Sequence, residues 1–310
     1  TVYAYDNMTL SPAAPLAFGA EYARYDYMNG RGLLSPRVEL TLTPASRTRI
    51  TTSLSRRELA SGAEEFQAPS DAGIWLPPQR TFSSIDPAEP FVAERAMNAA
   101  VGVERDLGVS TIALRAFRQQ VEDQLVTVFG GQAAGQPTSR SGHYIVGNGG
   151  DITARGVSAE FRAVIASRVH GSVQYTMAQA EVLDGGDKYL MLLAPMASRL
   201  STRAVQDVTA RLSADVPETS TRVMVLYRVG NGFAQPAPRT DASAGNGLDA
   251  RFDVQVRQSL PFMSFSNARW EMLFAVRNFF RDASYDQALF DELFVIHPPK
   301  RVVGGVALHF

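Results

Sequence analysis

The chain has 310 residues, of which 45% are hydrophobic and 20% charged, with a formal net charge of −1 and no cysteine. This charge balance gives no reason to expect nucleic-acid binding, and the lack of cysteine excludes disulfides and thiolate metal sites. The best candidate for a membrane helix, residues 189–197, is far shorter than the roughly 18 apolar residues that such a helix needs. Helical membrane spans are thereby excluded. Membrane β-strands remain open, because their in-and-out alternation averages to a weak hydropathy signal.

Apolar and polar side chains alternate along much of the chain, which is the pattern of strands with two unlike faces. In one such run, Phe252, Val254 and Val256 share one face, and polar side chains between them occupy the other. The pattern predicts about 13 strands of about 8 to 12 residues, close to the roughly 9–11 that a tilted strand needs to cross a bilayer. The clearest examples, in chain order, are residues 37–42, 157–165, 222–229, 251–258 and 269–278.

The connections between these strands alternate between short and long. Short turns on one rim and long loops on the other are typical of outer-membrane barrels, whereas a soluble sandwich has no reason to sort its loops in this way. The sequence therefore predicts an all-β fold, an antiparallel transmembrane β-barrel. The expected short turns are residues 11–15, 43–46, 107–110, 166–167, 214–219 and 264–267. The expected long loops are residues 28–35, 57–94, 130–151, 181–201, 230–250 and 279–300.

The two faces of the strands differ in chemistry, and a barrel gives each face its own solvent. We expect the apolar face to contact lipid and the charged face to line a wet lumen, where opposite charges on neighbouring strands can pair. Side chains expected to face hydrocarbon include Val225, Val254, Val256, Phe274 and Val276. Side chains expected to face the lumen include Arg257, Glu271 and Arg277.

The last predicted strand, residues 302–310, places Val306, Leu308 and Phe310 on one face and ends on the aromatic residue. A final strand that ends in phenylalanine resembles the insertion signal of outer-membrane barrels. The resemblance implies that the barrel assembly machinery binds this strand, and that outer-membrane lipid surrounds the folded protein.

Several stretches together resemble the barrel region of TonB-dependent receptors. They are Val-Gly-Val-Glu-Arg-Asp-Leu-Gly at 101–108, the run at 115–126, Asp-Ile-Thr-Ala-Arg-Gly-Val at 151–157, and the stretches at 275–280, 291–294 and 298–305. The resemblance implies a bacterial outer-membrane location and a barrel of 22 strands with an N-terminal plug and a TonB-contacting segment. Residues 1–310 show neither of the last two features, so we expect them to be one barrel region of a larger barrel, with upstream strands. A TonB-type energising complex is then a partner only where that N-terminal region is present.

Strand parity leads to the same expectation. With about 13 strands that alternate in direction, the first strand runs the same way as the last. Direct closure would then join them as a parallel pair, which single-chain bacterial barrels with even strand numbers avoid.

Candidate ligand contacts are aromatic and basic residues of the loops and lumen. The neighbouring Tyr22, Tyr25 and Tyr27 either stack on a ligand or belong to an interfacial aromatic girdle; Trp270 near the other rim fits a girdle. The three Gly-Asn-Gly repeats, at 147–149, 230–232 and 245–247, are interpreted as turns. No histidine has metal-ligand spacing and no nucleophile has an oriented base, so we expect no metal site, no cofactor and no enzyme activity. The candidate ligand-binding residues are Tyr25, Tyr27, Trp75, Tyr144, Tyr189 and Arg228.

The leading functional hypothesis is a receptor or transporter barrel whose long extracellular loops recognise a small-molecule or oligomeric nutrient. Loops on a rigid scaffold are where binding usually concentrates. We therefore expect deletions within 57–94 or 181–201 to abolish uptake while the barrel still folds. The alternative is a structural or interaction barrel of the outer membrane without active transport.

Overall fold

The computed structural model describes the chain over most of its length. The described residues are 1–28, 32–61, 81–86, 91–129, 143–182, 186, 203–230, 249–260, 269–277, 294–296 and 301–309. Within them, no helix is both long enough and apolar enough to serve as a membrane span.

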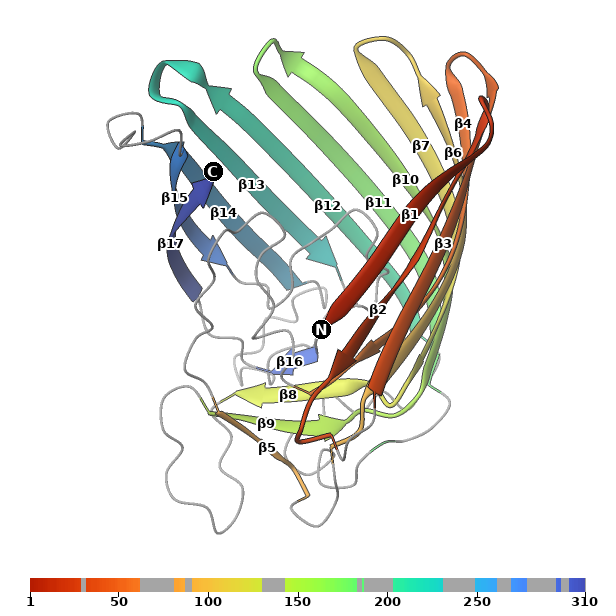
Figure 1. Cartoon of the computed structure of the whole chain (residues 1–310), viewed down its shortest axis with the longest axis vertical. Helices are drawn as coiled ribbons and strands as arrows, with labels where there is room; N and C mark the ends of the chain where they lie inside the picture. The colour runs from red at the N-terminus through yellow and green to blue at the C-terminus, as the bar shows by residue number, and fades with distance from the viewer. Residues whose placement is uncertain are drawn as a thin grey trace, which may run out of the picture.

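One antiparallel sheet of thirteen strands forms a curved wall, and each strand pairs with its neighbour in chain order (Figure 1). We call this sheet the barrel wall. Its strands are β1 (Val2–Ser11), β2 (Ala14–Arg24), β3 (Gly32–Ala45), β4 (Thr48–Leu59), β6 (Glu94–Asp106), β7 (Ser110–Glu122), β10 (Ile152–Ala166), β11 (Val169–Val182), β12 (Arg203–Val216), β13 (Thr221–Gly230), β14 (Asp249–Ser259), β15 (Arg269–Arg277) and β17 (Arg301–His309).

The strand count and the sorting of the connections agree with the sequence prediction. The wall strands run from 9 residues in β15 to 15 in β10, which is enough to cross a bilayer at a tilt. Turns close one rim at residues 12–13, 46–47, 107–109 and 167–168, and the 3-10 turn η2 (Pro217–Thr219) closes it between β12 and β13. We call this rim the short-turn rim and the opposite one the long-connection rim.

The backbone register confirms which residues share a face. Val225 lies opposite Val254, which lies opposite Val276, and Val256 lies opposite Phe274. These side chains lie on the outer face of the barrel wall. Large apolar side chains are exposed on the same face of the neighbouring strands, including Val157, Phe161 and Val173. Because successive residues of a strand point to opposite faces, Arg257 and Glu271 belong to the inner face, as expected.

The inner face carries paired charges toward the short-turn rim. Glu104 on β6 lies 3.2 Å from Arg49 on β4 and 2.7 Å from Arg162 on β10, and Arg162 also lies 3.3 Å from Glu160. The Arg162–Glu104 pair joins β10 to β6 across the intervening strand β7, as expected for charges that line a concave wall. Toward the long-connection rim the inner face of β6, β7, β10, β11 and β12 carries a buried apolar cluster. Its members are Ala96, Val121, Ile152, Ala154, Ala178, Ala180 and Val205.

A second sheet, which the sequence analysis missed, lies at the long-connection rim (Figure 1). We call it the rim sheet. Three different long connections supply its strands, in the order β16 (Phe294–Ile296), β8 (Leu125–Phe129), β9 (His143–Asn148) and β5 (Thr81–Ser84). The two outer pairings are parallel and the central one is antiparallel. Residues 143–148 were expected in a loop, so this part of the prediction is wrong.

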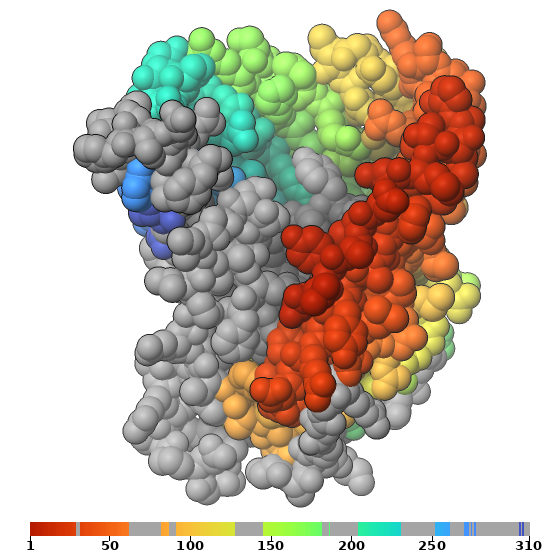
Figure 2. Space-filling model, in the orientation of Figure 1, coloured from red at the N-terminus to blue at the C-terminus, as the bar shows by residue number. Residues whose placement is uncertain are grey.

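The two edges of the barrel wall are β1 and β17, and the described residues show no pairing between them. Since every neighbouring pair among the thirteen strands is antiparallel, these two edge strands run in the same direction, as the sequence predicted. Figure 2 shows β1 passing obliquely along one margin of the wall.

Candidate functional site

The β8–β9 hairpin leaves the wall through a polar corner at Asp123. Asp123 directly follows β7 and has a φ of 55°, a left-handed conformation that aspartate tolerates better than most residues. Its backbone N–H donates to Asp151 at 2.9 Å, and its own carboxylate accepts a hydrogen bond from the Asn148 amide at 2.9 Å. The Asn148 oxygen in turn accepts from the backbone N–H of Gly150 at 2.7 Å. These bonds fix the base of the hairpin. Gly147 and Asn148 of the first Gly-Asn-Gly repeat belong to β9 and pair with β8, so the interpretation of this repeat as a turn is wrong for these two residues.

A buried carboxylate fixes β8 to the wall. Glu94, the first residue of β6, has a side chain that is only 1% exposed. One of its oxygens accepts a hydrogen bond from the backbone N–H of Leu125 at 2.9 Å, and the other lies 3.7 Å from the Arg57 guanidinium on β4. Burying a charge is costly unless it is paired and hydrogen-bonded. Moving β8 would remove the hydrogen bond that Glu94 accepts, so the buried carboxylate favours this one placement of β8 against the wall.

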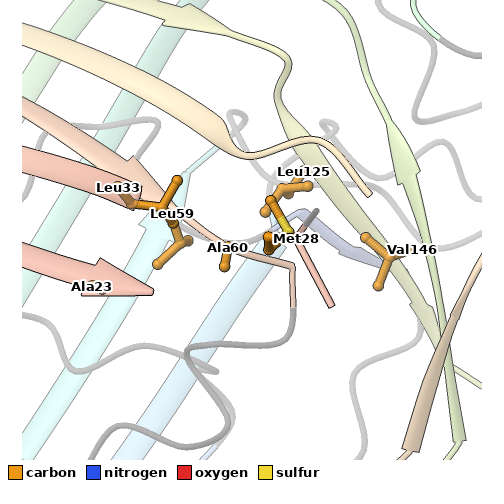
Figure 3. Close-up of a cluster of buried hydrophobic side chains, with 7 residues drawn as sticks. All are labelled: Ala23, Met28, Leu33, Leu59, Ala60, Leu125 and Val146. Atoms are coloured by element: carbon orange, nitrogen blue, oxygen red, sulfur yellow. The ribbon is translucent and has the colours of Figure 1, made fainter. Parts of the chain in front are cut away.

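An apolar cluster continues this attachment (Figure 3). Its members come from the wall strands, from the connections beside them and from the rim sheet, so they hold the rim sheet against the wall. The buried side chains are Ala23, Met28, Leu33, Leu59, Ala60, Leu125 and Val146.

Four aromatic rings pack on this cluster. The Tyr27 ring lies 5.5 Å from Tyr25, and it meets Phe82 and Phe91 edge-on at 5.3 and 5.9 Å between centroids. The Tyr27 hydroxyl donates to the backbone carbonyl of Ser61 at 2.8 Å. Tyr27 is therefore a packing residue in this structure, and Tyr25 forms the half-buried margin of the same cluster.

The structure places only some of the predicted ligand contacts together. Tyr25 and Tyr27 lie in the aromatic cluster, and Tyr144 belongs to β9, where its backbone is in register with Phe82. Trp75 and Tyr189 lie outside the described residues. Sequence analysis missed Phe82, Phe91 and Glu94, because it treated 57–94 as a loop without structure of its own.

Arg228 lies near the long-connection rim, but on a different strand from the residues of the aromatic cluster. It lies on the inner face of β13, with its side chain 12% exposed, and its Nε is 2.6 Å from a carboxylate oxygen of Asp207 on β12. Asp207 also accepts a hydrogen bond from the Thr209 hydroxyl at 3.0 Å. The predicted basic contact is thus a nearly buried ion pair in the inner wall, and sequence analysis missed its partner.

β17 is the last strand of the barrel wall and forms one of its two edges. Val306 is 54% exposed and lies opposite Met272, and the backbone of Leu308 lies opposite Trp270. Val306 thus lies on the outer face, as the insertion-signal interpretation requires; Phe310 lies outside the described residues. Among the described residues, no three histidine, aspartate or glutamate side chains form a group that could hold a metal ion.

The strand lengths, the two-faced wall and the sorted rims define an outer-membrane β-barrel protein. The family model for the TonB-dependent receptor-like β-barrel matches residues 1–288. The chain belongs to this family, and it is a protein of the bacterial outer membrane. A comparison with curated proteins gave no match.

Solved structures that align with this chain include one receptor and two transporters. The siderophore receptor PirA of Pseudomonas aeruginosa is 14% identical, with a TM-score of 0.42 over 99% of this chain and 48% of its own. The FrpB iron transporter of Neisseria meningitidis is 18% identical, with a TM-score of 0.39 over 98% and 44%. The copper transporter OprC is 11% identical, with a TM-score of 0.39 over 99% and 47%. The chain spans about half the length of these proteins.

Proposed function

We propose that the chain forms the wall and the recognition rim of an outer-membrane receptor for nutrient uptake. In this proposal the long-connection rim faces the cell exterior and binds a small-molecule or oligomeric nutrient. A TonB-type complex supplies the energy for uptake, and the protein catalyses no reaction.

The rim sheet is the observation that carries this proposal. Strands from three separate connections pair at one rim, whereas the described connections of the other rim are short turns. A barrel needs no such structure in order to fold. Ordered connections on a rigid scaffold are the usual place for recognition.

Two features of the long-connection rim suit ligand contact. Tyr25 is half-buried at the margin of the aromatic cluster, where a tyrosine ring can stack on a ligand. Arg228 and Asp207 place a charged pair on the inner face of the same rim. We assign the first contact to Tyr25 and a later contact, during passage along the inner wall, to Arg228.

The test exchanges residues 130–142, which join β8 to β9, for a glycine–serine linker of equal length. A matched control changes residues 167–168, in the short turn between β10 and β11, to Asn-Gly, a favoured pair for two-residue hairpins. Uptake of three labelled probes is measured in cells: a ferric siderophore, cupric ion and a maltooligosaccharide. We expect saturable uptake of one probe that stops when the TonB-type complex is inactivated, is lost in the 130–142 exchange and persists in the control. Unchanged uptake in the 130–142 exchange would place recognition elsewhere.

The alternative is a structural barrel without active transport. It predicts that no probe enters by a saturable, energy-dependent route, although the folded protein is present in the outer membrane. The same uptake assay therefore separates the two functions.

A further inference from the structure

Two arginines lie directly opposite each other on the outer face of the barrel wall. Arg118 on β7 and Arg155 on β10 are register partners, and both side chains are exposed. Their row continues to Ala99 on β6 and to Gln179 on β11. Like charges placed directly opposite on a sheet are destabilising, so we expect a negatively charged group to offset the repulsion between these two arginines.

The pair lies at the boundary of the apolar outer band. On the short-turn side, the next outward residues are Ala116 and Val157, which are also register partners. On the long-connection side, the next outward pair is polar, Gln120 and Thr153. An outward arginine destabilises such a barrel strongly near the midplane and only slightly near the interfaces. The position therefore corresponds to the level of lipid headgroups.

Two other outward arginines at this rim have carboxylate partners. Arg56 pairs with Glu58, and Arg95 lies 3.2 Å from Glu122. Within the described ranges, no carboxylate lies within ion-pair distance of Arg118 or Arg155. Arg155 donates one long hydrogen bond, 3.4 Å, to the Gln179 amide oxygen. In the part of the chain that the structure describes, two adjacent positive charges of the membrane-facing surface are thus without an ion-pair partner.

We propose that Arg118 and Arg155 bind the phosphate of an anionic lipid headgroup in the leaflet on the long-connection side. Guanidinium groups bind phosphate through paired hydrogen bonds, and a phosphate between them would turn their repulsion into attraction. The apolar band below the pair would take the acyl chains of the same lipid. A free anion gains nothing from that band, which is why we assign the site to a lipid.

The source of the phosphate depends on orientation. If the long-connection rim faces outward, as proposed above, the ligand is lipid A; if it faces inward, the ligand is a glycerophospholipid. The experiment includes both lipids, so a failure of the proposed orientation is distinguishable from a failure of the lipid site.

The protein is extracted from outer membranes in neutral detergent. Its thermal stabilisation is titrated with diphosphoryl lipid A, dephosphorylated lipid A, phosphatidylglycerol and inorganic phosphate. The test variants are Arg118→Gln, Arg155→Gln and the double variant. The control is Arg105→Gln, which removes an exposed outward arginine near the short-turn rim whose guanidinium donates to the Thr48 hydroxyl. Heat-modifiable migration on gels confirms that each variant is folded.

We expect diphosphoryl lipid A to stabilise the unmodified protein and Arg105→Gln equally. Each test substitution should weaken this binding about tenfold, or about 1.4 kcal/mol, because it removes one charged hydrogen bond to the phosphate. Dephosphorylated lipid A should not stabilise. Stabilisation by phosphatidylglycerol through the same arginines would support the lipid site and count against the proposed orientation. Equal stabilisation by inorganic phosphate, or binding that the double substitution leaves unchanged, would overturn the proposal.

Discussion

The two rims of the barrel wall are built from the same strands and yet differ in almost every respect. The described connections of the short-turn rim contain only a few residues each, and an exposed ion pair between Arg168 and Glu218 joins two of them. The long-connection rim carries the rim sheet, a buried carboxylate at Glu94 and an apolar cluster with four aromatic rings. The short-turn rim only reverses the chain. The opposite rim has its own core, as expected for a surface that must keep a fixed shape.

The wall that both rims share should be the part most sensitive to substitution. Val254 lies on the outer face opposite Val225 and Val276. Val254→Arg should destabilise the inserted barrel by about 2–4 kcal/mol and impair assembly. Arg257→Val, on the inner face of the same strand, should be tolerated far better. The yield of heat-modifiable protein in outer membranes measures both, and equal tolerance would contradict the assignment of the faces.

The next largest effect should appear at the long-connection rim alone. Glu94→Ala leaves the buried N–H of Leu125 without its acceptor, a loss of about 1–3 kcal/mol. We expect hydrogen exchange of β8 and β9 to accelerate while the exchange of β10 and β11 stays slow. Glu122→Ala removes a half-exposed carboxylate that pairs with Arg95, and should change little. Uniform acceleration over the wall would show that the rim sheet does not open independently.

A smaller effect should follow from the aromatic cluster. Tyr27→Phe keeps the ring contacts but removes the hydrogen bond to the Ser61 carbonyl, at a cost of about 0.5–1.5 kcal/mol. Tyr175→Phe, on the exposed outer face of β11, is the control with the same chemical change. We expect hydrogen exchange of the β8 and β9 amides to be faster in Tyr27→Phe than in Tyr175→Phe. An identical response would mean that the Tyr27 hydroxyl does not stabilise the rim.

The smallest effect should come from the short-turn rim. The Arg168 guanidinium, together with a backbone N–H, holds the pKa of the exposed Glu218 carboxylate below its ordinary 4.5. Because the folded pKa is lowered, the stabilisation is fully present above pH 4.5 and is lost as the pH falls through the folded pKa. Glu218→Gln should therefore show a slightly shallower loss of stability in acid. Urea unfolding at pH 6 and pH 3 measures the free energy of unfolding of both proteins. If Glu218→Gln lowered this free energy at pH 6 by more than Glu94→Ala does, the short-turn rim would contribute more to stability than the long-connection rim, contrary to the expected order.

The barrel wall could be predicted from sequence because its signals are local. Strand alternation repeats over nine or more residues, and short turns are visible between strands. Each strand pairs with the next in the chain, so the order needs no long-range information. The faces of Val225, Val254 and Phe274 follow from the same alternation.

The rim sheet could not be predicted because its signals are not local. Its strands contain as few as three residues, and two of its three pairings are parallel contacts between distant connections. Glu94 resembles any surface carboxylate in the sequence, and only the fold buries it. The expected connections at 107–110 and 130–151 left the segment between them as one strand, whereas a left-handed residue at Asp123 redirects the chain.

The central claim is that the long-connection rim is the recognition surface and faces the cell exterior. The chain has no cysteine, so single cysteines give a clean background for labelling. Asp26→Cys reports on an exposed position beside the aromatic cluster, and Val109→Cys reports on a short turn where the side chain is 73% exposed. A membrane-impermeant maleimide on intact cells should label Asp26→Cys at once and Val109→Cys only after the outer membrane is permeabilised. Labelling of Val109→Cys on intact cells, with Asp26→Cys protected, would contradict the account.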